Sequence, residues 1–294
     1  MTAVNFRVTQ TSISASTLRG LQANLARVQD LQAQLSSGKR ISVPSDDPSG
    51  TASAMTFRSQ QAADEQYLRN IDQVSSRLGV TDNTLTQLSD RLRAVRELMV
   101  EAGNAGLGPD SRAALASQAG ALKSEIVDLY NTTYLGRPVF GGTVSGVQAV
   151  DPATGAYVGN EQPVTARISR DATVRIDVRG SEAGADTTPA LLDRIVADLG
   201  GTATIPSADF TDLDATMSRV LQTLGDVGAR AARVDSTKTN VDAHRLDLTV
   251  RISENEDVDL PATIMNLQSQ QVAYQSALGA SAKILQTSLV DFLK

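Results

Sequence analysis

The chain has 294 residues and a net charge of −6, because 33 acidic side chains outnumber 27 basic ones, which argues against a general nucleic-acid binder. Only 3% of the residues are aromatic and tryptophan is absent, so Ala, Leu, Val and Ile carry the apolar share, which favours thin helical layers and an elongated molecule. The lack of cysteine excludes disulfides, thiolate nucleophiles and cysteine-ligated zinc.

The first ten residues lack a basic start followed by an apolar run. No window holds the roughly 18 uninterrupted apolar residues that a membrane span needs. We therefore expect no membrane contact, and a protein that is either soluble or exported without a cleaved signal peptide.

The first predicted helix carries apolar residues spaced by threes and fours, which places them on one stripe: Leu18, Leu21, Leu25, Val28, Leu31 and Leu35. The stripe ends at Gly38. The next segment, Ile41 to Gly50, holds Pro44 and Pro48 around two aspartates, and these residue types fix turns and cap helices. It predicts an ordered loop between two helices.

A second stripe alternates steps of four and three without interruption from Tyr67 to Met99, which is a seven-residue repeat. Such a repeat requires a partner helix along its length. Glycines and Pro109 break the pattern, and a shorter stripe from Leu115 to Leu129 predicts a helix that folds back on the first as an antiparallel hairpin.

The middle of the chain changes character, because Gly, Thr, Pro and Val dominate from about residue 140 to 205. Residues 164–168 and 174–178 alternate apolar with polar side chains and predict two strands. The apolar residues from Leu191 to Leu199 predict one short helix. We interpret this region as a small mixed domain inserted between helical arms.

Helical order returns on a heptad grid from Leu213 to Ile252, and the simplest way to bury this stripe is to pack it against the stripe of residues 67–99. A last helix follows Pro261 and runs essentially to Lys294. Its only remaining internal neighbour is the first helix, so we infer that the two ends pair with each other or with other subunits.

The predicted fold class is therefore mainly α: a long antiparallel helical rod resembling a coiled-coil bundle, built from both chain ends, with a small β-containing inserted domain. We expect five segments: an N-terminal helix in residues 1–44, the two halves of the rod in 45–140 and 206–260, the insertion in 141–205, and a C-terminal helix in 261–294.

Two short motifs carry a resemblance to a known family. Residues 34–41 read QLSSGKRI, residues 44–48 read PSDDP, and both closely resemble the N-terminal signature of the flagellin superfamily. Asn70-Ile71-Asp72, residues 140–143 and the last apolar residues support the match, which covers about residues 10–143 and 205–294. The signature positions are Ser37, Gly38, Lys39, Arg40, Pro44, Asp46, Asp47 and Pro48.

Within that superfamily, the Ser-Asp-Asp-Pro sequence preceded by Pro44 resembles the hook-filament junction subunits, where flagellin usually shows Lys-Asp-Asp-Ala. The resemblance implies an extracellular subunit of the bacterial flagellum that joins hook-associated protein 1 to flagellin. It further implies assembly with copies of itself and a flagellar export chaperone, with no enzyme activity, cofactor or metal. A short flagellin that forms the filament itself is the nearest alternative.

The resemblance also implies that the terminal helices are disordered in the monomer and form an inner coiled coil on assembly. An ordinary intramolecular helix pair is the alternative. The expected interface residues are Leu18, Leu21, Leu25, Val28, Leu35, Ile264, Leu267, Tyr274, Leu278, Leu285, Leu289 and Phe292.

Chemical explanations of the polar motifs are weaker than structural ones. Asp46 and Asp47 fit a capped turn better than a catalytic or metal-binding pair. Lys39 and Arg40 either pair with the acidic residues from Glu254 to Asp259 or stay solvated. An enzyme carried on a helical scaffold would use His244, the only histidine, or the acidic cluster in a pocket. A coiled-coil adhesin or signalling protein would form a stable dimer.

Overall fold

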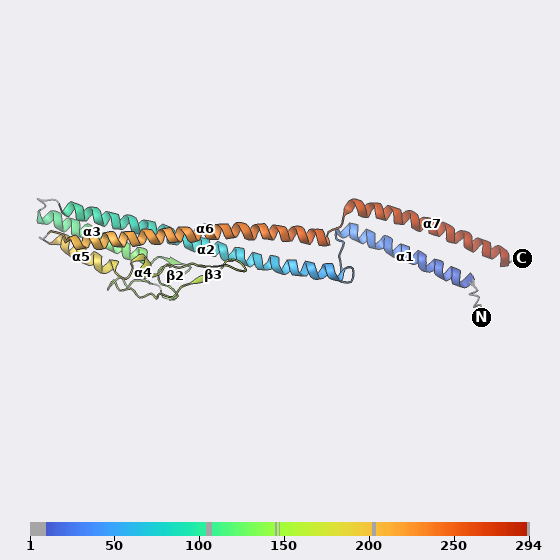
Figure 1. The fold of residues 1–294 in the computed structure, drawn as a ribbon, viewed down its shortest axis with the longest axis horizontal. Helices are drawn as coiled ribbons and strands as arrows, with labels where there is room; N and C mark the ends of the chain where they lie inside the picture. The colour runs from blue at the N-terminus through green and yellow to red at the C-terminus, as the bar shows by residue number, and fades with distance from the viewer. Residues whose placement is uncertain (1–9, 104–107, 145, 147, 202–203, 293–294) are drawn as a thin grey trace, which may run out of the picture. The chain divides into compact units, whose positions relative to one another are not determined.

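The computed structural model describes residues 10–103, 108–144, 146, 148–201 and 204–292, apart from the side chains of residues 10–14 and 284–292 (Figure 1). Its helices are α1 (Gln10–Ser37), α2 (Pro48–Ala102), α3 (Pro109–Tyr130), α4 (Gly180–Ala183), α5 (Thr188–Gly200), α6 (Ser207–Glu256) and α7 (Leu260–Phe292). The strands are β1 (Thr133–Tyr134), β2 (Arg137–Pro138), β3 (Thr165–Arg167) and β4 (Thr173–Arg175). The predicted mainly helical fold with a small β region is confirmed.

Contacts divide the chain into two compact units, which we describe separately. The first unit comprises residues 1–61 and 246–294, and the second unit comprises residues 62–245. These units cut across the five segments expected from the sequence, whose boundaries stay predictions.

In the second unit, α2 and α6 run antiparallel, as two ion pairs show. Arg96 Nε lies 2.7 Å from Asp214 Oδ1, and Lys238 Nζ lies 2.7 Å from Asp72 Oδ1, so residue numbers fall along α6 as they rise along α2. Both pairs are exposed and contribute little stability by themselves. They show, however, how the two helices are aligned.

The heptad stripe of α2 is the core of this unit. None of its nine positions from residue 71 to residue 99 is more than 2% exposed: Ile71, Val74, Leu78, Thr81, Leu85, Leu88, Leu92, Val95 and Met99. The α6 stripe is apolar at every seventh residue, namely Leu213, Val220, Val227, Val234 and Val241. Buried Thr216 and Thr223 fill two of the intervening positions, and the hydroxyl of each donates a hydrogen bond to the carbonyl four residues earlier.

Two further helices complete a four-helix arrangement, in which α3 packs against α5. An ion pair joins each neighbouring pair of helices: Arg91 with Glu125 for α2 and α3, Lys123 with Asp193 for α3 and α5, Arg194 with Asp212 for α5 and α6, and Arg96 with Asp214 for α6 and α2. This closed cycle specifies the order of the helices around the core. The predicted hairpin of α2 and α3 is part of it.

The middle of the chain forms two small antiparallel hairpins. The predicted strand pair is confirmed as β3 and β4, with Ala166 opposite Val174, although both strands are shorter than expected. The β1–β2 hairpin was not predicted from the sequence, and neither was the short helix α4.

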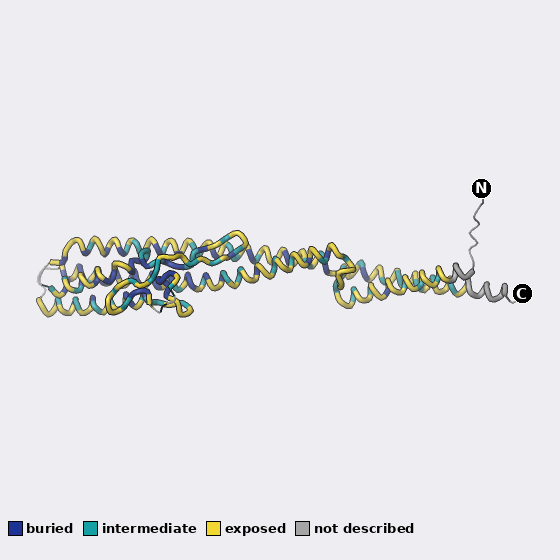
Figure 2. The backbone as a smooth tube through the Cα atoms, turned by 90° about the horizontal axis from the view of Figure 1, so that it is seen from below, coloured by how far each residue is buried: buried dark blue, intermediate teal, exposed yellow. Residues whose placement is uncertain are grey.

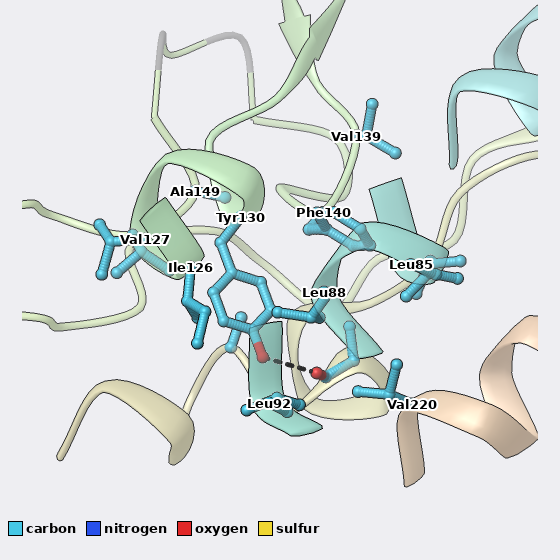
Figure 3. Packing of buried hydrophobic residues seen from close by; sticks show 14 of the residues in the cluster. Leu85, Leu88, Leu92, Ile126, Val127, Tyr130, Val139, Phe140, Ala149 and Val220 are labelled. Atoms are coloured by element: carbon cyan, nitrogen blue, oxygen red, sulfur yellow. Dashed lines mark hydrogen bonds between the residues drawn. The ribbon is translucent and has the colours of Figure 1, made fainter. Parts of the chain in front are cut away.

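Tyr130 fastens this middle region to the helices (Figure 3). Its ring meets Phe140 edge-on, with centroids 5.9 Å apart, and its hydroxyl lies 2.9 Å from the Ala183 carbonyl and 3.1 Å from Thr188 Oγ1. Complete burial raises the pKa of the Tyr130 hydroxyl, so it stays a neutral donor.

Candidate assembly interface

The first unit pairs the two ends of the chain, because α1 packs along α7 (Figure 1). The amides of Asn24 and Gln270 are hydrogen-bonded at 3.2 Å across the pair. The less exposed side of each helix follows a heptad: Thr17, Leu21, Asn24, Val28, Leu31 and Leu35 on α1, and Thr263, Leu267, Gln270, Tyr274, Ala277 and Ser281 on α7. These positions form the seam.

The seam buries few apolar side chains. Val28 is the one buried apolar side chain among the described residues of α1, and half of the seam positions on α7 are polar (Figure 2). A helix in water depends on burying an apolar face, so this pair gains far less from packing than the second unit does.

The expected interface residues divide between the seam and its flank. Leu21, Val28, Leu35, Leu267 and Tyr274 occupy the seam. Four others stay exposed beside it: Leu18, Leu25, Ile264 and Leu278. The remaining three, Leu285, Leu289 and Phe292, lie where side chains are outside the described residues.

The four exposed residues share one heptad position. Leu18 and Leu25 lie three residues before and four residues after the seam residue Leu21, and Ile264 lies three residues before the seam residue Leu267. A two-fold axis relates the helices of an antiparallel pair, so residues at the same heptad position of the two helices lie on the same side of the seam. Leu18 and Leu25 therefore flank the seam on the same side as the exposed leucine and isoleucine of α7. Met265 and Val272, 66% and 62% exposed, extend this uncovered face on α7.

Exposed apolar residues concentrate in the first unit. Of the fifteen large apolar side chains exposed in the described part of the chain, only four belong to the larger second unit: Val100, Leu135, Val158 and Leu221. The other eleven belong to the first unit. Concentrated exposed apolar surface marks sites of association in soluble proteins.

The signature loop, residues 37–48, connects the end of α1 to α2 and docks on the chain between α6 and α7. Gly38 has φ +69°, a conformation that suits glycine, and ends α1. The Arg40 N–H donates to the Glu256 carbonyl at 2.6 Å, and the Val258 N–H donates to the Gly38 carbonyl at 3.0 Å. These two hydrogen bonds hold residues 38–40 of the loop against residues 256–258.

Charged side chains reinforce this contact, which confirms the pairing of Lys39 with the acidic segment. Lys39 Nζ lies 2.5 Å from Asp257 Oδ1 and 3.7 Å from Glu256 Oε2, while Arg58 lies 2.7 Å from Glu256. The Lys39 ammonium holds the pKa of Asp257 below its usual value, and the Asp257 carboxylate raises the pKa of Lys39.

Arg40 uses different partners from those expected. Its guanidinium donates to the Asn255 carbonyl at 2.6 Å and to Asp47 Oδ2 at 3.3 Å, so it does not pair with the acidic side chains between residues 254 and 259. Asp259 caps α7 instead, accepting the Ala262 N–H at 3.1 Å.

Asp46 folds the signature loop. Its Oδ2 accepts the Ser42 and Val43 N–H groups at 2.9 and 3.0 Å, with exposed Pro44 between, and these hydrogen bonds lower the pKa of Asp46. This is the arrangement of a turn whose backbone donors are satisfied locally.

Asp47 begins α2. Its Oδ1 accepts the Gly50 N–H at 2.9 Å, and Pro48 occupies the first helical position, where no N–H is needed. The Gly50 amide and the Ser49 hydroxyl lower the pKa of Asp47. The capped turn predicted for both aspartates is thus the observed geometry.

Other chemistry has little support in the described part of the chain. His244 lies on α6 with Nδ1 2.6 Å from Asp64 Oδ2, a pairing between helices in the second unit. No group of three or more His, Cys, Asp or Glu side chains there is arranged to hold a metal. Nor does any described helix combine the length and apolar content that a membrane crossing requires.

Comparison with known proteins agrees with this architecture. Residues 8–145 match the bacterial flagellin N-terminal helical region, and residues 210–293 match the bacterial flagellin C-terminal helical region. Flagellar hook-associated protein 3 of Salmonella typhimurium is 25% identical over 92% of this chain and 94% of its own length. The Escherichia coli protein of that name is 26% identical over 94% and 96%.

Flagellin of Bacillus subtilis is also 26% identical, over 92% of this chain and 93% of its own length. Among solved structures, a Vibrio parahaemolyticus protein described as a flagellar hook-associated protein has a TM-score of 0.66 at 20% identity, covering 72% of this chain and all of that one. Hook-associated protein 3 of Legionella pneumophila has a TM-score of 0.61 at 11% identity, covering 68% and 98%.

These similarities support a structural subunit of the flagellar junction over a filament-forming flagellin. The two matched regions together span the terminal pair, the signature loop and most of the four-helix core. The chain therefore belongs to the flagellin family, whose members are structural components of the bacterial flagellum.

Proposed function

We propose that this subunit joins the hook-associated ring to the flagellin filament through coiled-coil contacts between its terminal helices and those of its neighbours. The observation that carries the proposal is the uncovered face on α1 and α7. That face is apolar, lies beside a seam that is itself incompletely sealed, and belongs to the unit that holds most of the exposed apolar side chains.

The thin seam gives a reason for assembly to be conditional. Ordering a residue costs about 1–2 kcal/mol of backbone entropy, and burial returns about 25 cal/mol for each Å² of apolar surface removed from water. The α1–α7 pair leaves much of its apolar surface in water, so neighbouring subunits would supply the missing burial. The terminal helices would then become ordered only on a growing structure.

The partners that follow are hook-associated protein 1 below, flagellin above and copies of the same chain around the ring. We further propose that the subunit is exported with the help of an export chaperone and works outside the cell. The proposed role involves no covalent chemistry. In keeping with it, Asp46 and Asp47 bind backbone amides and His244 pairs with Asp64.

A short flagellin is the second candidate, favoured by the similarity to the Bacillus subtilis protein. Self-assembly separates the two. Purified full-length chain in a salting-out sulfate buffer, followed by light scattering and electron microscopy, should stay monomeric if it needs a template. Long uniform filaments would make it a flagellin.

The uncovered face is tested by one substitution with a matched control. Leu278→Asp places a charge on the face, where burial against a neighbour would cost several kcal/mol. Leu221→Asp makes the same change on α6 of the second unit, and the two leucines are equally exposed, at 43% and 44%. Both variants should fold, because neither side chain is part of a core.

The readout is complementation of a strain whose own gene is deleted, with swimming and attached filaments scored by motility assay and electron microscopy. We expect Leu221→Asp to restore filaments and Leu278→Asp to be secreted without restoring them. If Leu278→Asp supports normal filaments, or both variants fail equally, the assigned face is wrong.

A further inference from the structure

A pocket of about 490 Å³ in the second unit has an unusual charge. It opens between α2, the β1–β2 hairpin and the β3–β4 hairpin. Arg77, Arg137 and Arg167 line it, one from each of these elements, and no aspartate or glutamate does. Three cations without a lining carboxylate stand out in a chain whose net charge is −6.

Arg77 is the most constrained of the three. It is only 7% exposed, and its Nε and Nη2 have no hydrogen-bond partner in the described structure. Burial lowers the pKa of Arg77, and the neighbouring Arg137 guanidinium lowers it further, against the opposing effect of Asp177. A buried donor without an acceptor is costly, so an acceptor that completes this site would be bound favourably.

The carboxylate that acts electrostatically on Arg77 is not hydrogen-bonded to it. Asp177 is fully buried, its Oδ1 accepts the Val164 N–H at 2.8 Å and the Arg175 Nε–H at 3.2 Å, and its Oδ2 has no hydrogen-bond partner in the described structure. Arg137 and Arg167 lie in strands that flank the pocket.

We propose that this pocket binds an oxyanion, a carboxylate or a phosphate, held by the guanidinium of Arg77 with Arg137 and Arg167. Guanidinium groups present paired N–H donors that match the oxygens of either anion, and such charge-assisted hydrogen bonds are among the strong ones. The site is independent of the proposed role at the junction.

The rim indicates how the two sources of the anion can be told apart. Leu135, at the tip of the β1–β2 hairpin, has φ +50° and is 80% exposed. It is the one non-glycine residue with a positive φ in the described part of the chain. An apolar side chain beside the arginines would contact a carboxylate carried by a polypeptide, but would add nothing for free phosphate.

The test is a titration of the full-length chain at constant ionic strength, followed through the arginine Nε–Hε resonances by NMR. The probes are inorganic phosphate and a capped Leu-Glu dipeptide. Saturable shifts at Arg77 are expected, and Arg77→Met should weaken binding about tenfold or more, the loss of one charged hydrogen bond. Arg93→Met, an exposed change on the same helix, should leave affinity unchanged.

Arg137→Gln guards against a folding artefact and should also weaken binding. Arg77→Met should melt no lower than the wild type, since it removes buried donors that lack a partner. Phosphate binding unaffected by Leu135→Ser would support a free anion, and tighter dipeptide binding that this change weakens would support a carboxylate on another chain. Failure of both probes to saturate by about 50 mM, or equal affinity in the Arg77 and Arg93 variants, overturns the proposal.

Discussion

Replacing Tyr130 by phenylalanine tests how the middle region is fastened to the helical core. The change keeps the ring and its edge-on contact with Phe140, but removes the hydroxyl that binds the Ala183 carbonyl and Thr188. Ala183 ends α4 and Thr188 begins α5, so both partners follow the two hairpins in the chain. The variant therefore isolates one fully buried hydroxyl with its two hydrogen bonds.

The expected cost is roughly 1–2 kcal/mol, because a buried carbonyl loses its donor while the packing stays intact. For a unit of this size, each kcal/mol lowers the melting temperature by about 2–4 °C, so a shift of about 2–8 °C should follow. Circular dichroism during heating measures it. Tyr67→Phe is the matched control, since Tyr67 is partly buried and its hydroxyl has no hydrogen-bond partner in the described part of the chain.

Alkaline titration adds a second readout. The pKa of Tyr130 is raised in the folded protein, so its stabilising contribution is complete below the pKa of an unfolded tyrosine, about 10, and is lost as the pH rises beyond it. The stability gap between wild type and Tyr130→Phe should narrow above that pH. A gap below about 0.5 kcal/mol at neutral pH, or one that widens in alkali, would refute the reasoning.

Two further outcomes are expected, one from backbone conformation and one from charge. Gly136→Ala should lower the free energy of unfolding by roughly 1–2 kcal/mol, the cost of the left-handed backbone alone. Gly142→Ala should lower it by roughly 3 kcal/mol or more, because its Cβ would also lie 2.2 Å from the Asn160 carbonyl oxygen; equal losses in thermal melts would contradict this. The pKa of Asp257 is lowered by Lys39, so its contribution is present above about pH 4 and lost as the pH falls through the folded value. The protection factors of the Arg40 and Val258 amides, which allow for the intrinsic pH dependence of exchange, should fall as the pH drops below about 4, and less steeply in Asp257→Asn.

The long helices could be predicted from the sequence because their stripes meet one uniform partner. Every apolar position expected on α2 from Ile71 to Met99 is buried. On α6 the agreement is partial. Met217 and Leu224, two positions of the heptad grid predicted from Leu213 to Ile252, are only half buried, and Thr216 and Thr223 reach the core beside them. A buried threonine that bonds its own helix looks like a surface residue in a hydrophobicity pattern.

The terminal helices show a different limit. Their apolar residues form a wide stripe, and periodicity cannot tell which part of such a stripe a partner covers. The seam includes Asn24 and Gln270, which no apolar pattern would select, while Leu18 and Leu278 remain outside it. Which residues are covered depends on how the partner helix packs, so only the structure could separate the seam residues from the exposed ones.

The site features that the sequence missed all depend on distant segments. Asp46 and Asp47 could be predicted to cap a turn because the backbone N–H groups that donate to them lie within four residues. The partners of Arg40 lie both nearby and more than 200 residues away, and the arginine pocket combines α2 with two hairpins that lie far along the chain. Tertiary contacts of this kind leave no local signal.

The two units differ in how completely each one buries its own apolar stripe. In the second unit the α2 stripe is closed to water within the chain, so its stability needs no neighbour. In the first unit the same kind of heptad leaves leucine, isoleucine, valine and methionine in water. Since packing and not propensity supports most helices, the α1–α7 pair should open at lower free energy than the four-helix core. The template-dependent assembly proposed above requires that inequality, because a terminal pair whose apolar residues were all buried within the chain would leave no apolar surface for a neighbouring subunit.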